Sequence, residues 1–126
     1  MDITKNIIDN MSNYDVSYDN ENYESEYKIM IIFCNINKIN NSWKKSLLYI
    51  TSNISELENK DKYIQSKKDL LSMKVEKPPF IYLTDDNNIE FIDGRHRFAN
   101  LRDMNCKKMP FIIYKTEYEI ISNLYC

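Results

Sequence analysis

The residues best suited to chemistry lie together in the stretch FIDGRHRFANLRD, residues 91–103. This stretch contains the only glycine of the chain, Gly94, its only histidine, His96, and its only arginines, at positions 95, 97 and 102. Every other basic residue is lysine, as is typical of a chain encoded by AT-rich DNA. The concentration of these scarce residue types in one stretch indicates a site rather than surface decoration.

The apolar residues around this stretch predict a strand, a turn and a helix. IEFI, residues 89–92, is typical of a strand that ends at Asp93. Gly94 permits a tight or left-handed turn that a Cβ atom would penalise. A helix then runs from Arg95 to about residue 105, with an apolar face formed by Phe98, Leu101 and Met104.

Such a turn predicts an anion-binding site. A helix N-terminus exposes unpaired N–H groups and partial positive charge, and guanidinium groups add paired donors suited to phosphate. The alternative is a helix start whose cations are merely exposed, but cations at this end oppose the helix dipole. Arg102 shares a face with Arg95, so it either supports the same site or pairs with Asp103 or Glu90. The predicted phosphate-binding residues are Gly94, Arg95, His96, Arg97 and Arg102.

Three residues of the turn, Asp93, His96 and Arg97, are candidates for catalysis. Arg97 would neutralise charge that develops on a phosphoryl group. His96 would donate a hydrogen bond to a phosphate oxygen or act as an acid or base. Asp93 would hold a metal ion or act as a nucleophile, and an equally good alternative is that it caps the helix through backbone N–H groups.

Length, charge and cysteine content restrict the class of protein. A chain of 126 residues is enough for one domain, which we divide into a polar arm, residues 1–26, and a domain, residues 27–126. The net charge of −2 argues against general nucleic-acid binding, and no apolar run is long enough to cross a membrane. Cys34, Cys106 and Cys126 show no metal-ligand spacing, so we expect free thiols, a reducing cytoplasm and no metal bound by cysteine.

The remaining sequence predicts an α+β fold, a small mixed sheet with packed helices. Apolar runs predict strands at 28–36, 80–83 and 109–114, and DKYIQSKKDLLSM predicts a helix over 61–73 with Tyr63, Ile64, Leu70 and Leu71 on one face. Trp43, Leu47, Ile50, Ile54 and Leu57 predict an amphipathic helix capped by Asn41 or Ser42. The turn 84–88 tolerates left-handed backbone, and the last eleven residues form a short helix or strand.

The arm, residues 1–26, is acidic and rich in Asn. We expect it to be loosely ordered and to pack its tyrosines, at 14, 18, 23 and 27, onto the domain. Its acidic composition also suits contact with a protein partner.

FIDGRHRFANLRDMNCKKMPFII resembles the core of the ParB/sulfiredoxin superfamily. In that family a strand ends in a D-G-x-R-R or G-C-H-R turn, followed by a helix and a Pro-containing strand, and residues Gly94, Arg97, Ala99, Leu101 and Pro110 fit this pattern. Weaker similarity extends over about residues 28–115. The resemblance implies a ParB/sulfiredoxin-like fold in which the turn and helix N-terminus hold nucleotide phosphates of ATP or CTP, with Mg²⁺.

Departures from the family pattern limit this implication. The sulfiredoxin nucleophile is a cysteine directly after the glycine, where this chain has Arg95, and Cys106 lies at the far end of the helix. The chain ends soon after the last core strand, so we expect no partition-type DNA-binding domain. No residue matches the family's catalytic acid, and Glu21, Glu24 and Glu26 are candidates by type only.

Three functions follow. The first is a nucleotide-phosphate-binding enzyme, a nucleoside-triphosphate-dependent phosphotransferase or a nucleotide hydrolase. The second is a non-enzymatic nucleotide sensor or interaction protein, such as a phage-encoded inhibitor of a host system. The third is a DNA-binding or nuclease module, against which the negative net charge counts. Turnover distinguishes the first from the second.

Overall fold

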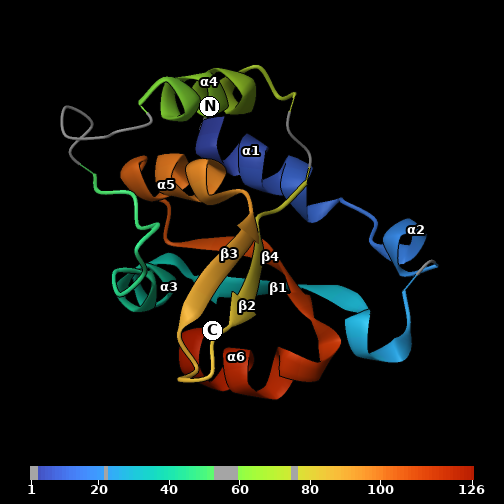
Figure 1. Cartoon of the computed structure of the whole chain (residues 1–126). Coiled ribbons are helices and arrows are strands. Elements are labelled where there is room, and N and C mark those ends of the chain that lie inside the picture. The colour runs from blue at the N-terminus through green and yellow to red at the C-terminus, as the bar shows by residue number, and fades with distance from the viewer. Residues whose placement is uncertain (1–2, 22, 53–59, 75–76) are drawn as a thin grey trace.

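The computed structural model describes residues 3–21, 23–52, 60–74 and 77–126 (Figure 1). A four-stranded sheet has the order β1-β4-β2-β3. β1 pairs antiparallel with β4 and β2 pairs antiparallel with β3, whereas β2 and β4 are parallel. The sheet is therefore mixed, and the predicted α+β class is confirmed. The strands are β1 (Ile29–Asn35), β2 (Phe80–Leu83), β3 (Ile89–Asp93) and β4 (Lys108–Tyr114).

The helices form two groups around the sheet. α4 (Lys60–Leu71) contacts both α1 (Ile3–Ser12) and α5 (Arg95–Asp103), and α3 (Ile36–Trp43) contacts α6 (Tyr118–Tyr125) (Figure 1). No helix in the described ranges is long and apolar enough to cross a membrane. The shorter elements are α2 (Ser17–Asn20), η1 (Ser25–Tyr27) and η3 (Lys115–Glu117).

Trp43, at the end of α3, lies at the centre of the core. It is fully buried, and the rings of Tyr49, Phe91 and Phe98 surround it at centroid distances of 5.0, 4.7 and 5.6 Å. Phe98 in turn packs on Phe111 of β4 at 5.8 Å. These edge and tilted ring contacts fix α5 on the sheet.

Most predicted elements are present. The four predicted strands match within one or two residues, and the 61–73 helix corresponds to α4. Only half of its predicted face is buried, since Tyr63 and Leu70 are covered whereas Ile64 and Leu71 are exposed. The C-terminal residues form the helix α6. In the turn between β2 and β3, Asn87 adopts φ 61°, the left-handed backbone expected there.

The sequence predicts an amphipathic helix that starts near Asn41, and within the described residues this prediction is wrong. The helix is α3, which begins earlier, and the side chain of Asn35 caps it by accepting a hydrogen bond from the Lys38 amide at 3.0 Å. After Trp43 the chain turns, because the Ser46 hydroxyl bonds Glu90 at 2.9 Å and accepts from the Leu48 amide at 3.0 Å. Leu47 is fully exposed, and Ile54 and Leu57 lie outside the described residues.

The expectation of a loosely ordered arm is also wrong for residues 3–12. They form α1, and Ile7 and Met11 are fully buried in the same core cluster as Trp43. Among the tyrosines, Tyr14 packs onto the sheet residues Ile29, Phe80 and Ile112, whereas Tyr23 and Tyr27 are exposed. The division at residue 26 stays a prediction, but α1 is part of the core.

The structure joins Cys34 of β1 to Cys126 at the end of α6 by a disulfide. This pairing corrects the expectation of three free thiols. Cys106 stays outside the pair, half-buried after α5. No sequence pattern indicates the pairing, because the two cysteines are 92 residues apart.

Candidate functional site

The turn that precedes α5 has the left-handed backbone predicted for Gly94, with φ 86° and ψ 18°. Space restricts this position as well. A Cβ atom built on Gly94 would lie 2.8 Å from the Cα of Pro79 and 2.7 Å from the Nη2 of Arg97. Glycine is therefore required for the backbone conformation and for the close approach of the turn to Pro79 and Arg97.

The N-terminus of α5 has no side-chain cap. Its first intrahelical bond runs from the Phe98 amide to the Gly94 carbonyl at 2.9 Å, so the amides of residues 95–97 precede the hydrogen-bonded ladder. Asp93 does not cap the helix, because the N-cap position is Gly94 and the Asp93 carboxylate bonds Arg97 instead. The capping alternative for Asp93 is therefore wrong.

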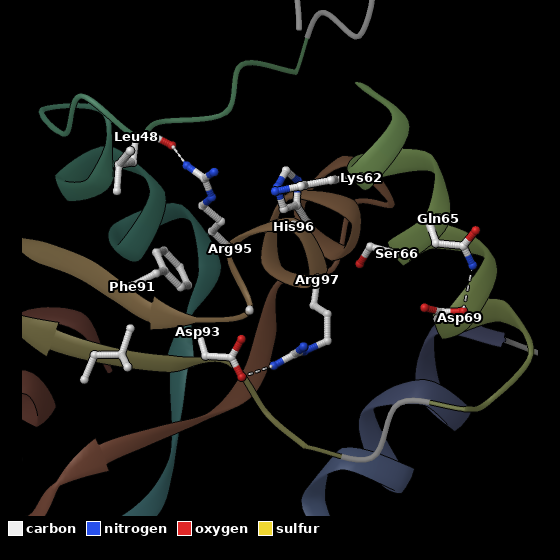
Figure 2. A pocket seen from close by; sticks show the side chains of 12 residues that line it. Leu48, Lys62, Gln65, Ser66, Asp69, Phe91, Asp93, Arg95, His96 and Arg97 are labelled. Atoms are coloured by element: carbon white, nitrogen blue, oxygen red, sulfur yellow. Dashed lines mark hydrogen bonds and ion pairs between the residues drawn. The ribbon is translucent and has the colours of Figure 1, made fainter. Parts of the chain in front are cut away.

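A cavity of about 480 Å³ opens in front of this helix end. One wall is the turn and first residues of α5, and the other is the face of α4 (Figure 2). Between them lie apolar side chains from β3 and from the segment after α3. The lining residues are Leu48, Lys62, Gln65, Ser66, Asp69, Phe91, Ile92, Asp93, Gly94, Arg95, His96 and Arg97.

Arg97 is a largely buried cation in the cavity wall, with 17% of its side chain exposed. Its Nη2 lies 3.2 Å from the Oδ2 of Asp93, a partner that is 54% exposed (Figure 2). The Nε of Arg97 is buried and has no hydrogen-bond partner within the described part of the chain. Since buried donors are normally paired, this N–H group is available to an acceptor that enters the cavity.

Both ring nitrogens of His96 are also buried, and neither has a hydrogen-bond partner among residues 3–21, 23–52, 60–74 and 77–126. The pKa of this imidazole lies below 6.5, chiefly because burial disfavours the charged form and further because Arg95 and Lys62 are close. His96 is therefore neutral at neutral pH in the free protein.

Arg95 lies at the mouth of the cavity, where its Nη1 donates to the Leu48 carbonyl at 3.4 Å (Figure 2). Among the described residues, one long hydrogen bond leaves most of the guanidinium donors of Arg95 unused. This bond brings the segment after α3 to the edge of the cavity.

The α4 wall is a part of the site that the sequence does not predict. Lys62, Gln65, Ser66 and Asp69 follow the spacing i, i+3, i+4, i+7 and line the cavity together. Gln65 donates to Asp69 at 3.0 Å, and the Ser66 hydroxyl is buried without a described partner. The polar stripe is visible in the sequence, but polar stripes on helices usually face solvent, so the pattern carries no sign of a cavity.

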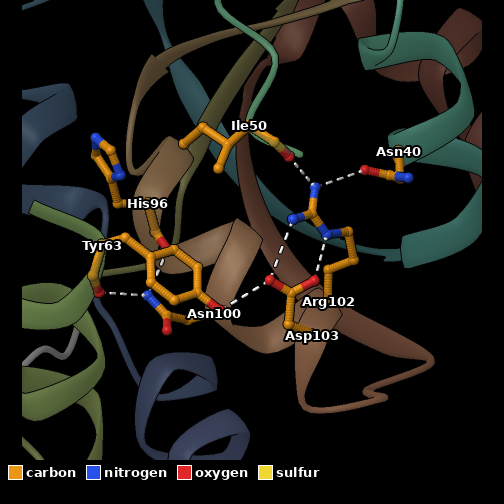
Figure 3. A network of polar contacts seen from close by, with 7 residues as sticks. All are labelled: Asn40, Ile50, Tyr63, His96, Asn100, Arg102 and Asp103. Atoms are coloured by element: carbon orange, nitrogen blue, oxygen red, sulfur yellow. Dashed lines mark hydrogen bonds and ion pairs between the residues drawn. The ribbon is translucent and has the colours of Figure 1, made fainter. Parts of the chain in front are cut away.

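Arg102 lies apart from the other predicted ligands and does not line the cavity. Its Nε bonds Asp103 at 2.8 Å, and its Nη1 donates to Asn40 at 3.1 Å and to the carbonyl of Ile50 (Figure 3). Of the two alternatives for this residue, the pairing with Asp103 is the one found.

Asn100 links the two helical walls. It is 1% exposed, and its Nδ2 donates to the Tyr63 carbonyl of α4 at 3.0 Å and to the His96 carbonyl at 2.9 Å (Figure 3). The Tyr63 hydroxyl donates to Asp103 at 2.8 Å, and burial together with this bond raises the pKa of Tyr63 to about 12. The bond from Asn100 to the Tyr63 carbonyl holds α4 against α5 beside the cavity.

The other sequence candidates do not reach this cavity. Glu21, Glu24 and Glu26 are exposed near α2 and η1 and are absent from its lining, and Glu90 bonds Ser46. Within the part of the chain that the structure describes, no group of three His, Cys, Asp or Glu residues could hold a metal ion.

Comparisons with protein-family models, curated proteins and solved structures found no match.

Proposed function

We propose that the cavity between α4 and α5 binds the phosphate groups of a nucleotide, as in the ParB/sulfiredoxin-like proteins that the sequence resembles. One observation carries this proposal: the Nε of Arg97 and the ring nitrogens of His96 are buried, have no partner within the described ranges, and lie at an uncapped helix N-terminus. Lys62 and Arg95 add positive charge around the same space. Unpaired donors, the helix dipole and clustered cations all favour an anion.

The size and lining of the cavity fit more than an inorganic ion. Phe91, Ile92 and Leu48 provide an apolar wall beside the cationic one. A phosphorylated molecule with a flat or apolar body, such as ATP or CTP, would use both walls.

The residues fit Mg²⁺ only together with a nucleotide. Mg²⁺ is commonly held by one or two carboxylates and by substrate phosphates. Asp93 and Asp69 are the carboxylates in the cavity lining that would serve. The ion would neutralise phosphate charge, and Arg95 and Arg97 would stabilise the charge that develops during phosphotransfer or hydrolysis.

The second candidate, a nucleotide sensor without turnover, is favoured by the Asp93–Arg97 ion pair. The ion pair engages the Asp93 carboxylate, which an enzyme would need for binding Mg²⁺ or for catalysis. A sensor would bind nucleotide and keep it intact, so product formation separates the two functions.

The test is thermal unfolding of the protein with ATP, CTP, GTP, UTP and ADP, each with and without Mg²⁺. A ligand at one hundred times its Kd adds about 2.7 kcal/mol to the free energy of unfolding, several degrees in Tm. Arg97→Met should abolish the increase. Lys68→Met, which removes one positive charge from α4 outside the cavity lining, should retain it. No increase with any nucleotide would refute the proposal.

A further inference from the structure

His96 is the single histidine of the chain, and the imidazole is held beside the proposed phosphate site without a described hydrogen-bond partner. A neutral imidazole normally pairs its N–H group when it is buried, because an unpaired buried donor costs free energy. Within the described residues, both ring nitrogens are therefore available to a group that enters the cavity.

The charged groups around His96 come from three elements. α5 contributes Arg95 and Arg97, α4 contributes Lys62 and Asp69, and β3 contributes Asp93. Both carboxylates already accept bonds, Asp93 from Arg97 and Asp69 from Gln65.

Tyr63 also lies on α4, but its hydroxyl donates to Asp103 and stays protonated, since its pKa is about 12. Burial, and further the positive charges of Arg95 and Lys62, therefore favour the neutral form of the imidazole and lower its pKa.

We propose that binding of an anion in this cavity is coupled to uptake of one proton by His96, so that the affinity for the anion rises as the pH falls. The coupling rests on the proposed function, because the anion is the phosphate group of the nucleotide. An anion offsets the charge of Arg95 and Lys62 and stabilises the imidazolium form. By linkage, a protonated His96 strengthens anion binding by the same factor.

The chain allows a direct test, because one histidine gives one imidazole signal set in NMR of protein labelled with ¹⁵N-histidine. The titration is recorded without ligand, with sulfate and with ATP. Sulfate stays a dianion throughout, so its own ionisation does not contribute. Saturating ligand should raise the His96 pKa by about one pH unit or more. A rise of that size corresponds to a Kd for sulfate about tenfold lower at low pH than at high pH.

A variant separates protonation from simple charge attraction. His96→Gln should bind sulfate with little pH dependence, whereas Lys68→Met should keep the full dependence. Sulfate or ATP binding with an unchanged or lowered His96 pKa would overturn the coupling and leave the proposed function intact. Absence of binding by either ligand at every pH would refute both. The wild-type titration alone decides the coupling if the His96→Gln variant fails to fold.

Discussion

Gly94 is subject to two separate restrictions, and a pair of substitutions can separate them. Its φ of 86° disfavours any residue with a Cβ atom, and that atom would also lie 2.8 Å from the Cα of Pro79. Asn tolerates left-handed backbone better than Ala does, but it carries the same Cβ. We predict that Gly94→Ala and Gly94→Asn each lower the free energy of unfolding by about 2 kcal/mol or more.

Urea unfolding measures both variants. If Gly94→Asn proved much more stable than Gly94→Ala, the contact with Pro79 would not be limiting and backbone conformation alone would explain the glycine.

The lowered pKa of His96 predicts how the stability of the ligand-free protein depends on pH. The unfolded chain has a histidine pKa near 6.5, above the folded value, so below about pH 6.5 the unfolded state binds more protons. The contribution of His96 to the free energy of unfolding is therefore fully present above about pH 6.5. It is lost as the pH falls through the pKa of His96 in the folded protein. His96→Gln should lose less stability than the wild type between neutral and mildly acidic pH.

The measurement is the difference between the two proteins in urea unfolding at each pH. The pKa of Glu117 is raised by burial, which acts in the opposite direction, but both proteins share this group and the difference removes it. Equal losses in wild type and His96→Gln would mean that His96 titrates alike in the folded and unfolded states.

At the scale of elements, the α4–α5 contact sets the width of the cavity. Asn100 is the buried link between the two helices, and its substitution leaves the Tyr63 carbonyl without that donor. We predict that Asn100→Ala lowers the free energy of unfolding by about 2 kcal/mol and weakens nucleotide binding as well.

Tyr63→Phe is the matched control for Asn100→Ala, because it removes a bond to Asp103 at the same helix pair but away from the cavity. It should lower Tm and leave the nucleotide Kd unchanged. Binding that survives Asn100→Ala unaltered would show that the cavity does not depend on this link.

The elements also explain how far the sequence can predict the fold and the site. The strands and α5 are predictable because their apolar residues follow the period of the element, as Phe98 and Leu101 do. The bounds of α3 are not predictable from the sequence. Its Asn residues have low helix propensity, and the chain turns after Trp43, where the Ser46 hydroxyl bonds Glu90 on the distant strand β3. The spacing of Ile7 and Met11 is compatible with α1, but the Asp and Asn residues around them obscure it.

The same reasoning applies to the site. Residues 93–97 can be found in the sequence because they are contiguous and of scarce types. The α4 wall cannot be found in the sequence, because only tertiary packing brings Lys62 and Ser66 opposite the turn at Gly94. The helical face of Arg102 suggests the phosphate site, but the carbonyl of Ile50 and the side chain of Asn40 bind this guanidinium elsewhere.

At the scale of the whole molecule, the disulfide joins the first strand to the last residue. A cross-link between residues 92 apart restricts residues 34–126 of the unfolded chain, and loop-closure entropy for such a length corresponds to about 4–5 kcal/mol. Reduction should therefore lower the urea midpoint substantially. Cys126→Ser should reproduce the reduced protein, and Cys106→Ser should leave the response to reductant unchanged.

The Cys34–Cys126 bond and the proposed phosphate site lie in different parts of the structure, since neither cysteine lines the cavity. The reduced protein should therefore still bind nucleotide at a temperature well below its Tm, with the Kd of the oxidised form. Thiol counting by mass spectrometry under non-reducing conditions should find one alkylated cysteine, Cys106. Alkylation of all three cysteines would show that the chain folds without the cross-link and would restore the expectation of a fully reduced protein.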